Sequence, residues 1–224
     1  MIYIAHRGNN GNDVENRLEG LLKTSEHSYI DGVEIDIHMT KDGKFVLSHN
    51  LLLKENLLEY HAITRYKLKK LKKQKFEIHH KPFPIHTLDE VLKKFPKDKI
   101  LLVECKTDTV SKEKFAKNLY RCIKRHPLKK LQLCSFDYAF IEYFKKKHPE
   151  FICGLIIGYT LNKGKNHQQF DFISLQYRDL HIKGKHKYIW TVNDKNLYKK
   201  ICKEKVEGII SDKIGLLLGK NTSF

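Results

Sequence analysis

Short apolar runs recur along the whole chain, and charged stretches with helical spacing separate them. Apolar runs of this length are typical of strands that are buried on both faces. The pattern predicts eight strands, at residues 2–5, 32–38, 100–105, 131–135, 152–157, 170–175, 188–192 and 208–211. It also predicts helices at residues 17–28, 88–95, 112–125, 137–147 and 195–204, of which the second opens with a capping box of Thr87 and Glu90.

Strands and helices that alternate in this way predict parallel strand pairing, and eight repeats predict an α/β fold of the closed TIM (β/α)8 barrel type. An open, doubly wound sheet is the competing architecture. Segments 159–169 and 178–187, after the fifth and sixth strands, are short and rich in Gly, Lys and His, so we expect reduced helices there. Residues 1–224 are therefore predicted to form a single barrel domain.

A longer connection follows the second strand. Residues 51–84 include the basic run YKLKKLKKQK, at positions 66–75. Because the connections that leave barrel strands lie on the C-terminal face, we expect a small insertion there. Such a run is most often a solvated helix face, but Leu68 and Leu71 among the lysines leave open a weak contact with an anionic membrane surface.

The charge of the chain favours anionic partners. Its 224 residues include 43 Lys and Arg against 26 Asp and Glu, a formal net charge of +17. Phosphates, nucleic acid and anionic lipid all fit such a surface. The lysines are spread over nearly every predicted helix instead of forming one block, so a lysine-rich composition without a specific partner is an equally good interpretation.

The cysteines and the termini favour a reducing compartment. The five cysteines are scattered and contain no Cys-x-x-Cys pair, which argues against a disulfide framework and against a zinc site. The first residues, MIYIAHRG, run directly into a strand with no leader pattern, and no apolar run is long enough to span a bilayer. We therefore expect a cytoplasmic protein.

Polar residues alternate with apolar ones in the second strand, GVEIDIH. The alternation puts Glu34, Asp36 and His38 on one face of the strand. Other polar side chains follow or end neighbouring strands: His6 and Arg7 after the first, Glu104 and Lys106 at the end of the third, and His49 after the segment KFVLS. In a barrel these groups converge on the C-terminal face.

Three convergent carboxylates repel one another strongly unless a cation neutralises them. Because Glu34, Asp36 and Glu104 offer only oxygen ligands, they fit magnesium or calcium better than zinc. Arg7 and Lys106 beside such an ion make a site for a phosphate oxyanion. The imidazoles of His6 and His49 titrate near neutrality and can act as acid and base on either side of phosphorus. The predicted chemistry is phosphodiester cleavage.

The chain resembles the glycerophosphodiester phosphodiesterase family from end to end. The fragments that carry the resemblance, in order, are HRG at 6–8, Glu15-Asn16, Glu-x-Asp with TKDG at 34–43, His49, PIHTLDEVL at 84–92, Glu-x-Lys at 104–106, WTVN at 190–193 and GIISD at 208–212. Any one of them is weak evidence alone, and eight in sequence are strong evidence.

The resemblance implies a TIM barrel that uses a divalent cation to hydrolyse a small-molecule glycerophosphodiester to an alcohol and glycerol 3-phosphate. Matching positions imply the metal ligands Glu34, Asp36 and Glu104, the acid/base pair His6 and His49, the phosphate binders Arg7 and Lys106, and a pocket-lining Trp190. The nucleophile is either water or the glycerol hydroxyl of the substrate, which would form a cyclic phosphate.

The chain departs from the family pattern at two positions. Asn50 stands where the family has Asp after the histidine, and Val14 stands where it has Pro. An asparagine can still orient a neighbouring imidazole, but it cannot supply a negative charge. The pattern therefore allows an altered rate or substrate.

Several residues and functions keep a second interpretation. A lone Trp190 is usually core packing, and His38 lies beyond the ligands and is most simply incidental. Asp212 orients a histidine or caps the following turn, and we favour the structural role of a cap. The rival enzymes act on lysophospholipid, sphingomyelin or a polymeric glycerol-phosphate wall component. A protein that binds nucleic acid through its basic surface is the rival from another class, but three convergent acids argue against it, and so no nucleic acid is expected as a partner.

Overall fold

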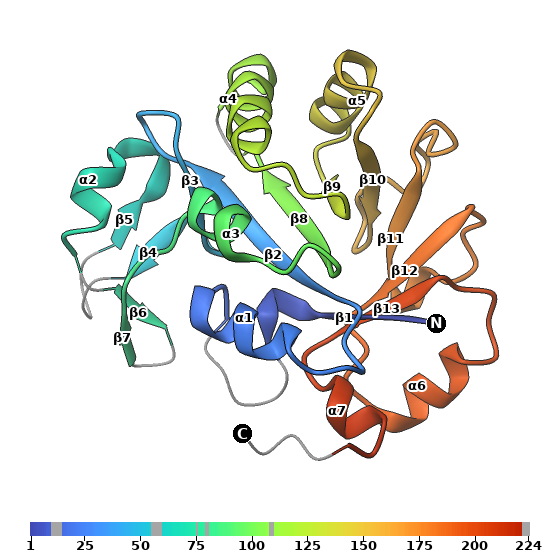
Figure 1. Ribbon diagram of the computed structural model, residues 1–224. Helices are drawn as coiled ribbons and strands as arrows, with labels where there is room; N and C mark the ends of the chain where they lie inside the picture. Colours follow the sequence, from blue (N-terminus) through green and yellow to red (C-terminus); the bar gives the residue numbers. More distant parts are fainter. Residues whose placement is uncertain (10–14, 55–59, 75, 79–80, 108–109, 221–224) are drawn as a thin grey trace.

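The strands form a closed parallel barrel in the computed structural model, which describes residues 1–9, 15–54, 60–74, 76–78, 81–107 and 110–220 (Figure 1). In the order of their pairing, the barrel strands are β1 (Ile2–Ala5), β2 (Gly32–Met39), β8 (Ile100–Lys106), β9 (Leu131–Ser135), β10 (Ile152–Ile157), β11 (Phe172–Gln176), β12 (His186–Trp190) and β13 (Gly208–Ser211). Strand β13 pairs with β1 and closes the ring. The predicted TIM barrel is therefore confirmed, and the open sheet is excluded.

Helices surround the ring of strands (Figure 1). They are α1 (Leu18–Ser25), α3 (Leu88–Lys94), α4 (Lys112–Arg125), α5 (Tyr138–Lys147), α6 (Lys195–Ile201) and α7 (Ile214–Leu217). The capping box predicted for α3 is present, since the Thr87 side chain accepts from the Glu90 backbone while the Glu90 side chain accepts from Thr87. The predicted reduced helices are also present: residues 158–171, all of them described, contain no helix, and β11 is followed only by the short 3-10 helix η3 (Tyr177–Asp179).

Two apolar cores follow from the alternation of side chains along the strands. One fills the barrel interior and contains Ile4, Leu102, Ile156, Phe172 and Ile210. The larger one lies between the strands and the helices. In it, the fully buried ring of Phe115 on α4 packs edge-on against Phe45 and Phe140, at centroid distances of 4.9 and 5.0 Å.

A small insertion follows β2 on one side of the barrel (Figure 1). It begins with β3 (Phe45–Leu47), which pairs antiparallel with β2, and continues through two hairpins, β4 (Leu52–Lys54) with β5 (Tyr60–Ala62) and β6 (Phe76–Ile78) with β7 (Lys81–Phe83). Between the hairpins lie η2 (Ile63–Arg65) and α2 (Leu68–Leu71). Leu71 is fully buried with Val46, Leu53 and Ile63, and Lys69, Lys70, Lys72 and Lys73 remain exposed. Only one turn of the basic run is thus helical, with its leucines directed toward this cluster.

Some element boundaries differ from the sequence prediction. Helix α1 ends at Ser25 instead of residue 28, because the N–H groups of Glu26 and His27 bond to Lys23 and Thr24 and close a turn. The sixth and seventh strands are β11 at 172–176 and β12 at 186–190, each shifted by about two residues. Their parallel pairing with one another, from Phe172 opposite His186 onward, fixes these bounds. Among the described residues, no helix combines the length and apolar character needed to cross a bilayer.

Truncating Phe115 tests the packing between barrel and helices. We expect Phe115→Ala to lower the free energy of unfolding by about 3–5 kcal/mol, since it removes a fully buried ring and leaves a cavity between two other rings. Urea unfolding followed by circular dichroism measures this. The control Leu216→Ala changes a side chain that is 50% exposed and should cost well under half as much. Equal losses for the two variants would contradict the packing described.

Candidate active site

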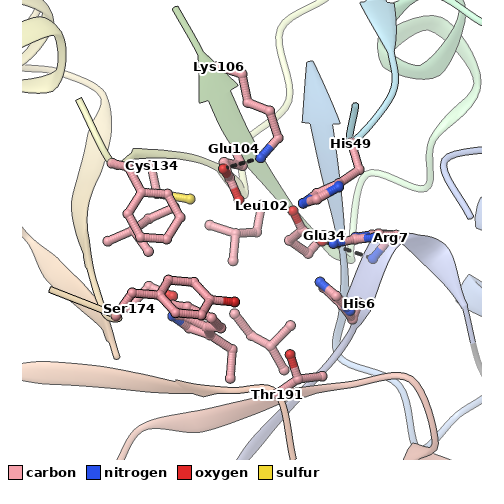
Figure 2. A pocket seen from close by; sticks show the side chains of 15 residues that line it. His6, Arg7, Glu34, His49, Leu102, Glu104, Lys106, Cys134, Ser174 and Thr191 are labelled. Carbon is pink, nitrogen blue, oxygen red and sulfur yellow. Dashed lines mark hydrogen bonds and ion pairs between the residues drawn. The ribbon is translucent and has the colours of Figure 1, made fainter. Parts of the chain in front are cut away.

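The register of the strands brings the predicted polar residues together. Asp36 of β2 lies opposite Glu104 of β8, and His38 lies opposite Lys106. On the other side of β2, Ala5 pairs with Val33, so that His6 and Glu34 follow at the next position. Figure 2 shows His6, Arg7, Glu34, His49, Glu104 and Lys106 directed into one pocket at this end of the barrel.

The three acidic residues form a tight carboxylate cluster. One oxygen from each of Glu34, Asp36 and Glu104 lies within 4.8 Å of the others. Glu34 and Asp36 are only 4% and 1% exposed. Burial, together with the charge of Asp36, raises the pKa values of Glu34 and Glu104 above their ordinary range. The cluster therefore carries more negative charge than its surroundings easily accommodate.

Lys106 and Arg7 offset part of this charge. The Lys106 ammonium lies 2.5 Å from a Glu104 oxygen and 3.1 Å from Asp36 Oδ1. The Arg7 guanidinium lies 3.4 Å from Asp36 Oδ2, and the Arg7 backbone N–H donates to Glu34 at 2.8 Å. Burial alone would raise the pKa of Asp36, but the charges of Lys106 and Arg7 outweigh it and lower that pKa. Of the three carboxylates, Asp36 is thus the one whose ionised form its neighbours favour most.

A left-handed turn aims Arg7 at the cluster. Arg7 and Gly8 have φ angles of 53° and 71°, and a Cβ at Gly8 would meet the Leu21 side chain at 2.1 Å. Gly8 is therefore required both by its backbone conformation and by the close approach of α1. Glu15 accepts from Arg7 Nη1 at 2.7 Å and holds the guanidinium in place.

His6 is the central member of a hydrogen-bonded chain. Its Nδ1 donates to Asp212 Oδ1 at 2.8 Å, and Asn193 Nδ2 donates to the other oxygen of Asp212 at 2.6 Å. Burial alone would lower the pKa of His6, but the hydrogen bond to Asp212 and the charge of Glu34 outweigh it and raise the pKa. Of the two roles predicted for Asp212, the structure therefore supports orientation of a histidine.

His49 lies in a different electrostatic setting. Its Nδ1 donates to Asn50 Oδ1 at 3.0 Å, so the asparagine orients the ring as the sequence suggested it could. Burial and the positive charges of Arg7 and Lys106 lower the pKa of His49, although the charge of Asp36 opposes them. His38 is buried, and its Nε2 donates to the His49 carbonyl oxygen at 3.2 Å. His38 therefore positions the backbone of His49.

The opposite wall of the pocket is aromatic. Trp190 lies edge-on to Phe136 at a centroid distance of 5.8 Å and contacts Tyr159 at 5.7 Å. All three line the pocket together with Leu102 and Ile156 from the barrel interior. Trp190 therefore packs against neighbouring rings and also lines the pocket, so both interpretations of this residue from the sequence apply.

The structure brings all eight predicted site residues to this end of the barrel, and it adds residues that sequence reasoning did not assign to the site. Asp36 lies just beneath the pocket surface, where Asn16 donates to its Oδ2 and accepts from its backbone N–H, both at 3.0 Å. Glu15 and Asn16 belong to the Glu-Asn fragment that resembles the family, and Asp212 ends the fragment GIISD at 208–212, so both fragments pointed to these residues. Tyr159 had no signal of this kind.

Comparisons with known proteins agree with this geometry. The model of the glycerophosphoryl diester phosphodiesterase family matches residues 6–216. A glycerophosphodiester phosphodiesterase of Caldanaerobacter subterraneus subsp. tengcongensis is 26% identical over 94% of this chain and 93% of its own length.

Solved structures agree with the fold. The glycerophosphodiester phosphodiesterase of Thermotoga maritima has a TM-score of 0.77 and 26% identity, with 97% of each chain covered. A phosphodiesterase of Oleispira antarctica, solved with its product sn-glycerol-3-phosphate, has a TM-score of 0.80 and 22% identity, and covers 98% of this chain and 96% of its own. With a family model matched over nearly its whole length, on a barrel whose carboxylates, cations and histidines meet in one pocket, the chain belongs to the glycerophosphoryl diester phosphodiesterase family.

Proposed function

We propose that this protein hydrolyses glycerophosphodiesters to an alcohol and glycerol 3-phosphate with the help of a divalent cation. The observation that carries the proposal is the cluster of Glu34, Asp36 and Glu104 within 4.8 Å, beside two cations and two histidines. The product bound by the Oleispira antarctica relative supports a small-molecule substrate of this class. A nucleic-acid-binding function is disfavoured, because a polyanion has no use for a pocket that contains three acids.

The carboxylate cluster fits a hard divalent cation. All of its donors are oxygens, which is the ligand set that magnesium and calcium prefer. Three carboxylates also exceed the two cations that contact them, and removal from water together with the charge of Asp36 raises the pKa values of Glu34 and Glu104. Glu34, Asp36 and Glu104 would hold the ion, and a bound ion polarises a phosphoryl oxygen and neutralises charge there.

Arg7 and Lys106 are the proposed phosphate binders. Both line the pocket, and both stay protonated because burial is outweighed by neighbouring carboxylates, which raise their pKa values. Fixed N–H donors at such a position stabilise the charge that develops on the phosphoryl oxygens. Glu15 and Asn16 would keep Arg7 and Asp36 in position for this task.

The two histidines are suited to opposite roles. The raised pKa of His6 favours its protonated ring, because Asp212 and Glu34 outweigh the effect of burial. The lowered pKa of His49, from burial and from Arg7 and Lys106, leaves its ring neutral. We assign His6 as the acid that protonates the leaving alcohol and His49 as the base that activates the nucleophile, since pKa values pushed apart mark such pairs.

The aromatic wall formed by Phe136, Tyr159 and Trp190 would accommodate the carbon skeleton of the substrate.

A cytoplasmic location is consistent with the five free cysteines, of which all but Cys202 are buried. Weak contact of the segment 66–75 with an anionic membrane surface stays a proposal, and it would depend on the exposed lysines of that segment.

Removing the proposed cation or one of its ligands should stop turnover. We expect chelator to abolish release of glycerol 3-phosphate from glycerophosphocholine, and magnesium or calcium to restore it. Glu34→Gln should lower kcat/KM by at least about 100-fold, because an amide is a poor ligand for a hard cation.

The matched control is Glu113→Gln, which changes an exposed acid on α4 and should leave kcat/KM unchanged. Product formation that is insensitive to chelator would refute the role of the metal. No product with any metal would refute the enzyme assignment.

Asp212→Asn should shift the pH profile. Asp212, Glu34 and Arg7 are the charged groups that face His6, and the first two raise its pKa. Replacing Asp212 by Asn removes a negative charge, so the pKa of His6 falls and its acid form is lost at lower pH. We expect the alkaline limb of kcat/KM to move down by about one unit, whereas Asp98→Asn, at an exposed turn, leaves it in place. An alkaline limb that stays or moves up in Asp212→Asn would contradict the assignment of His6.

A further inference from the structure

Exposed apolar side chains gather where the pocket opens. Among the described residues, the large hydrophobic side chains with high exposure are Met1, Leu52, Ile152, Tyr159, Leu161 and Leu216. Met1 and Ile152 lie at the N-terminal ends of β1 and β10, at the opposite end of the barrel, and Leu216 lies on α7. Tyr159 and Leu161 lie in the turn after β10, at the C-terminal face, and Leu52 opens β4 in the insertion that follows β2.

The exposed side chains nearest the pocket come from two segments of the chain. Tyr159 lines the pocket and is 65% exposed, and Leu161, in the same turn, is 51% exposed. Leu52 is 51% exposed and lies three residues after the pocket-lining His49, a span of no more than about 11 Å. The turn follows β10, whereas Leu52 follows β2 and β3, which are separated from β10 in the ring by β8 and β9. The mouth is therefore apolar at Tyr159 and Leu161, and Leu52 adds an exposed apolar side chain close to His49 along the chain.

The turn at residues 158–161, which we name the rim turn, is firmly held despite its exposed tip. Gly158 and Leu161 exchange backbone hydrogen bonds of 2.8 and 3.3 Å. The next side chain, Asn162, donates from Nδ2 to the carbonyl oxygens of Phe136 and Ile156 at 2.8 and 2.9 Å. Because these hydrogen bonds fix the backbone of the turn, Tyr159 and Leu161 are held at the surface.

Basic residues flank the rim turn. Residues 159–167 include Lys163 and Lys165 and no acid. Arg178 on η3 is exposed as well, and the neighbouring Asp179 is buried and paired with Lys163 at 2.7 Å. Apolar tips among cations are typical of surfaces that enter the boundary between lipid headgroups and acyl chains. The net charge of +17 adds a general attraction to anionic surfaces.

We propose that the rim turn, together with Leu52, docks the mouth of the pocket on an anionic lipid bilayer. Tyr159 and Leu161 enter the headgroup region, and Lys165 and Arg178 contact anionic headgroups. The pocket then faces the membrane, where a phosphodiester whose alcohol carries an acyl chain can reach it. Contact between the Tyr159 and Trp190 rings explains the position of Tyr159, but it does not explain the exposure of Leu161 or Leu52. Docking needs no turnover, so it stands or falls independently of the proposed reaction.

Vesicle binding in chelator, with no substrate present, tests the proposal without catalysis. We expect the full chain to sediment with vesicles of phosphatidylcholine and phosphatidylglycerol, and to bind pure phosphatidylcholine vesicles at least about tenfold more weakly. Tyr159→Ser with Leu161→Ser should weaken binding to the anionic vesicles at least about tenfold, since two apolar side chains no longer leave water. The fixed backbone should survive these changes, because the bond from the Tyr159 N–H to Gln176 Oε1, at 3.0 Å, does not involve the tyrosine ring.

Leu216→Ser is the matched control, since it removes an equally exposed apolar side chain away from the mouth. It should bind anionic vesicles within about twofold of the unchanged chain. The proposal is overturned if the unchanged chain does not bind anionic vesicles, if the double variant binds as well as it does, or if Leu216→Ser weakens binding to the same extent. Equal binding to both vesicle types would overturn the part assigned to Lys165 and Arg178.

The single tryptophan of the chain gives a second readout. Trp190 contacts the ring of Tyr159, so its emission reports on this side of the mouth alone. Vesicles of phosphatidylglycerol with brominated acyl chains should quench this emission in the unchanged chain and in Leu216→Ser. Binding without quenching would mean that another face of the protein meets the bilayer, and would overturn the docking of the mouth.

Discussion

Mutual repulsion among three carboxylates, two of them buried and one half-buried, is the constraint around which this end of the barrel is built. Glu34, Asp36 and Glu104 lie within 4.8 Å of one another and largely out of water. At such distances like charges oppose ionisation unless cations offset them. The positive charges of Lys106 and Arg7 lower the pKa of Asp36. Burial and the charge of Asp36 raise the pKa values of Glu34 and Glu104, so the negative charge of these two carboxylates is not fully offset.

Each supporting element can be understood from this constraint. The parallel register sets Asp36 beside Glu104, and the left-handed turn at Arg7 and Gly8 directs a backbone N–H at Glu34. Asn16 donates to Oδ2 of Asp36, the oxygen that also faces the Arg7 guanidinium. The barrel interior below the cluster is apolar, so that water is excluded from beneath it and the charges interact strongly.

Much of this arrangement could be predicted from the sequence. Apolar runs gave the eight strands, and the alternation around Glu34 and Asp36, repeated in Glu104 and Lys106, predicted a shared face. The features that the sequence did not predict depend on contacts between distant segments. The pairing of β11 with β12 fixes their strand ends, and Leu71 of the basic run is buried against Val46, Leu53 and Ile63. The sequence left two roles open for Asp212, and its hydrogen bond to His6, which joins residues 206 positions apart, decides between them.

Calorimetric titration of magnesium or calcium into the chelator-treated chain tests the central claim most directly. If the carboxylates are held together as an ion site, one divalent ion should bind per chain, and Glu104→Gln should remove that binding while the barrel stays folded. Binding should also release protons, because the pKa values of Glu34 and Glu104 are raised by burial and by Asp36. No binding to the unchanged chain, or equal binding after Glu104→Gln, would contradict the account.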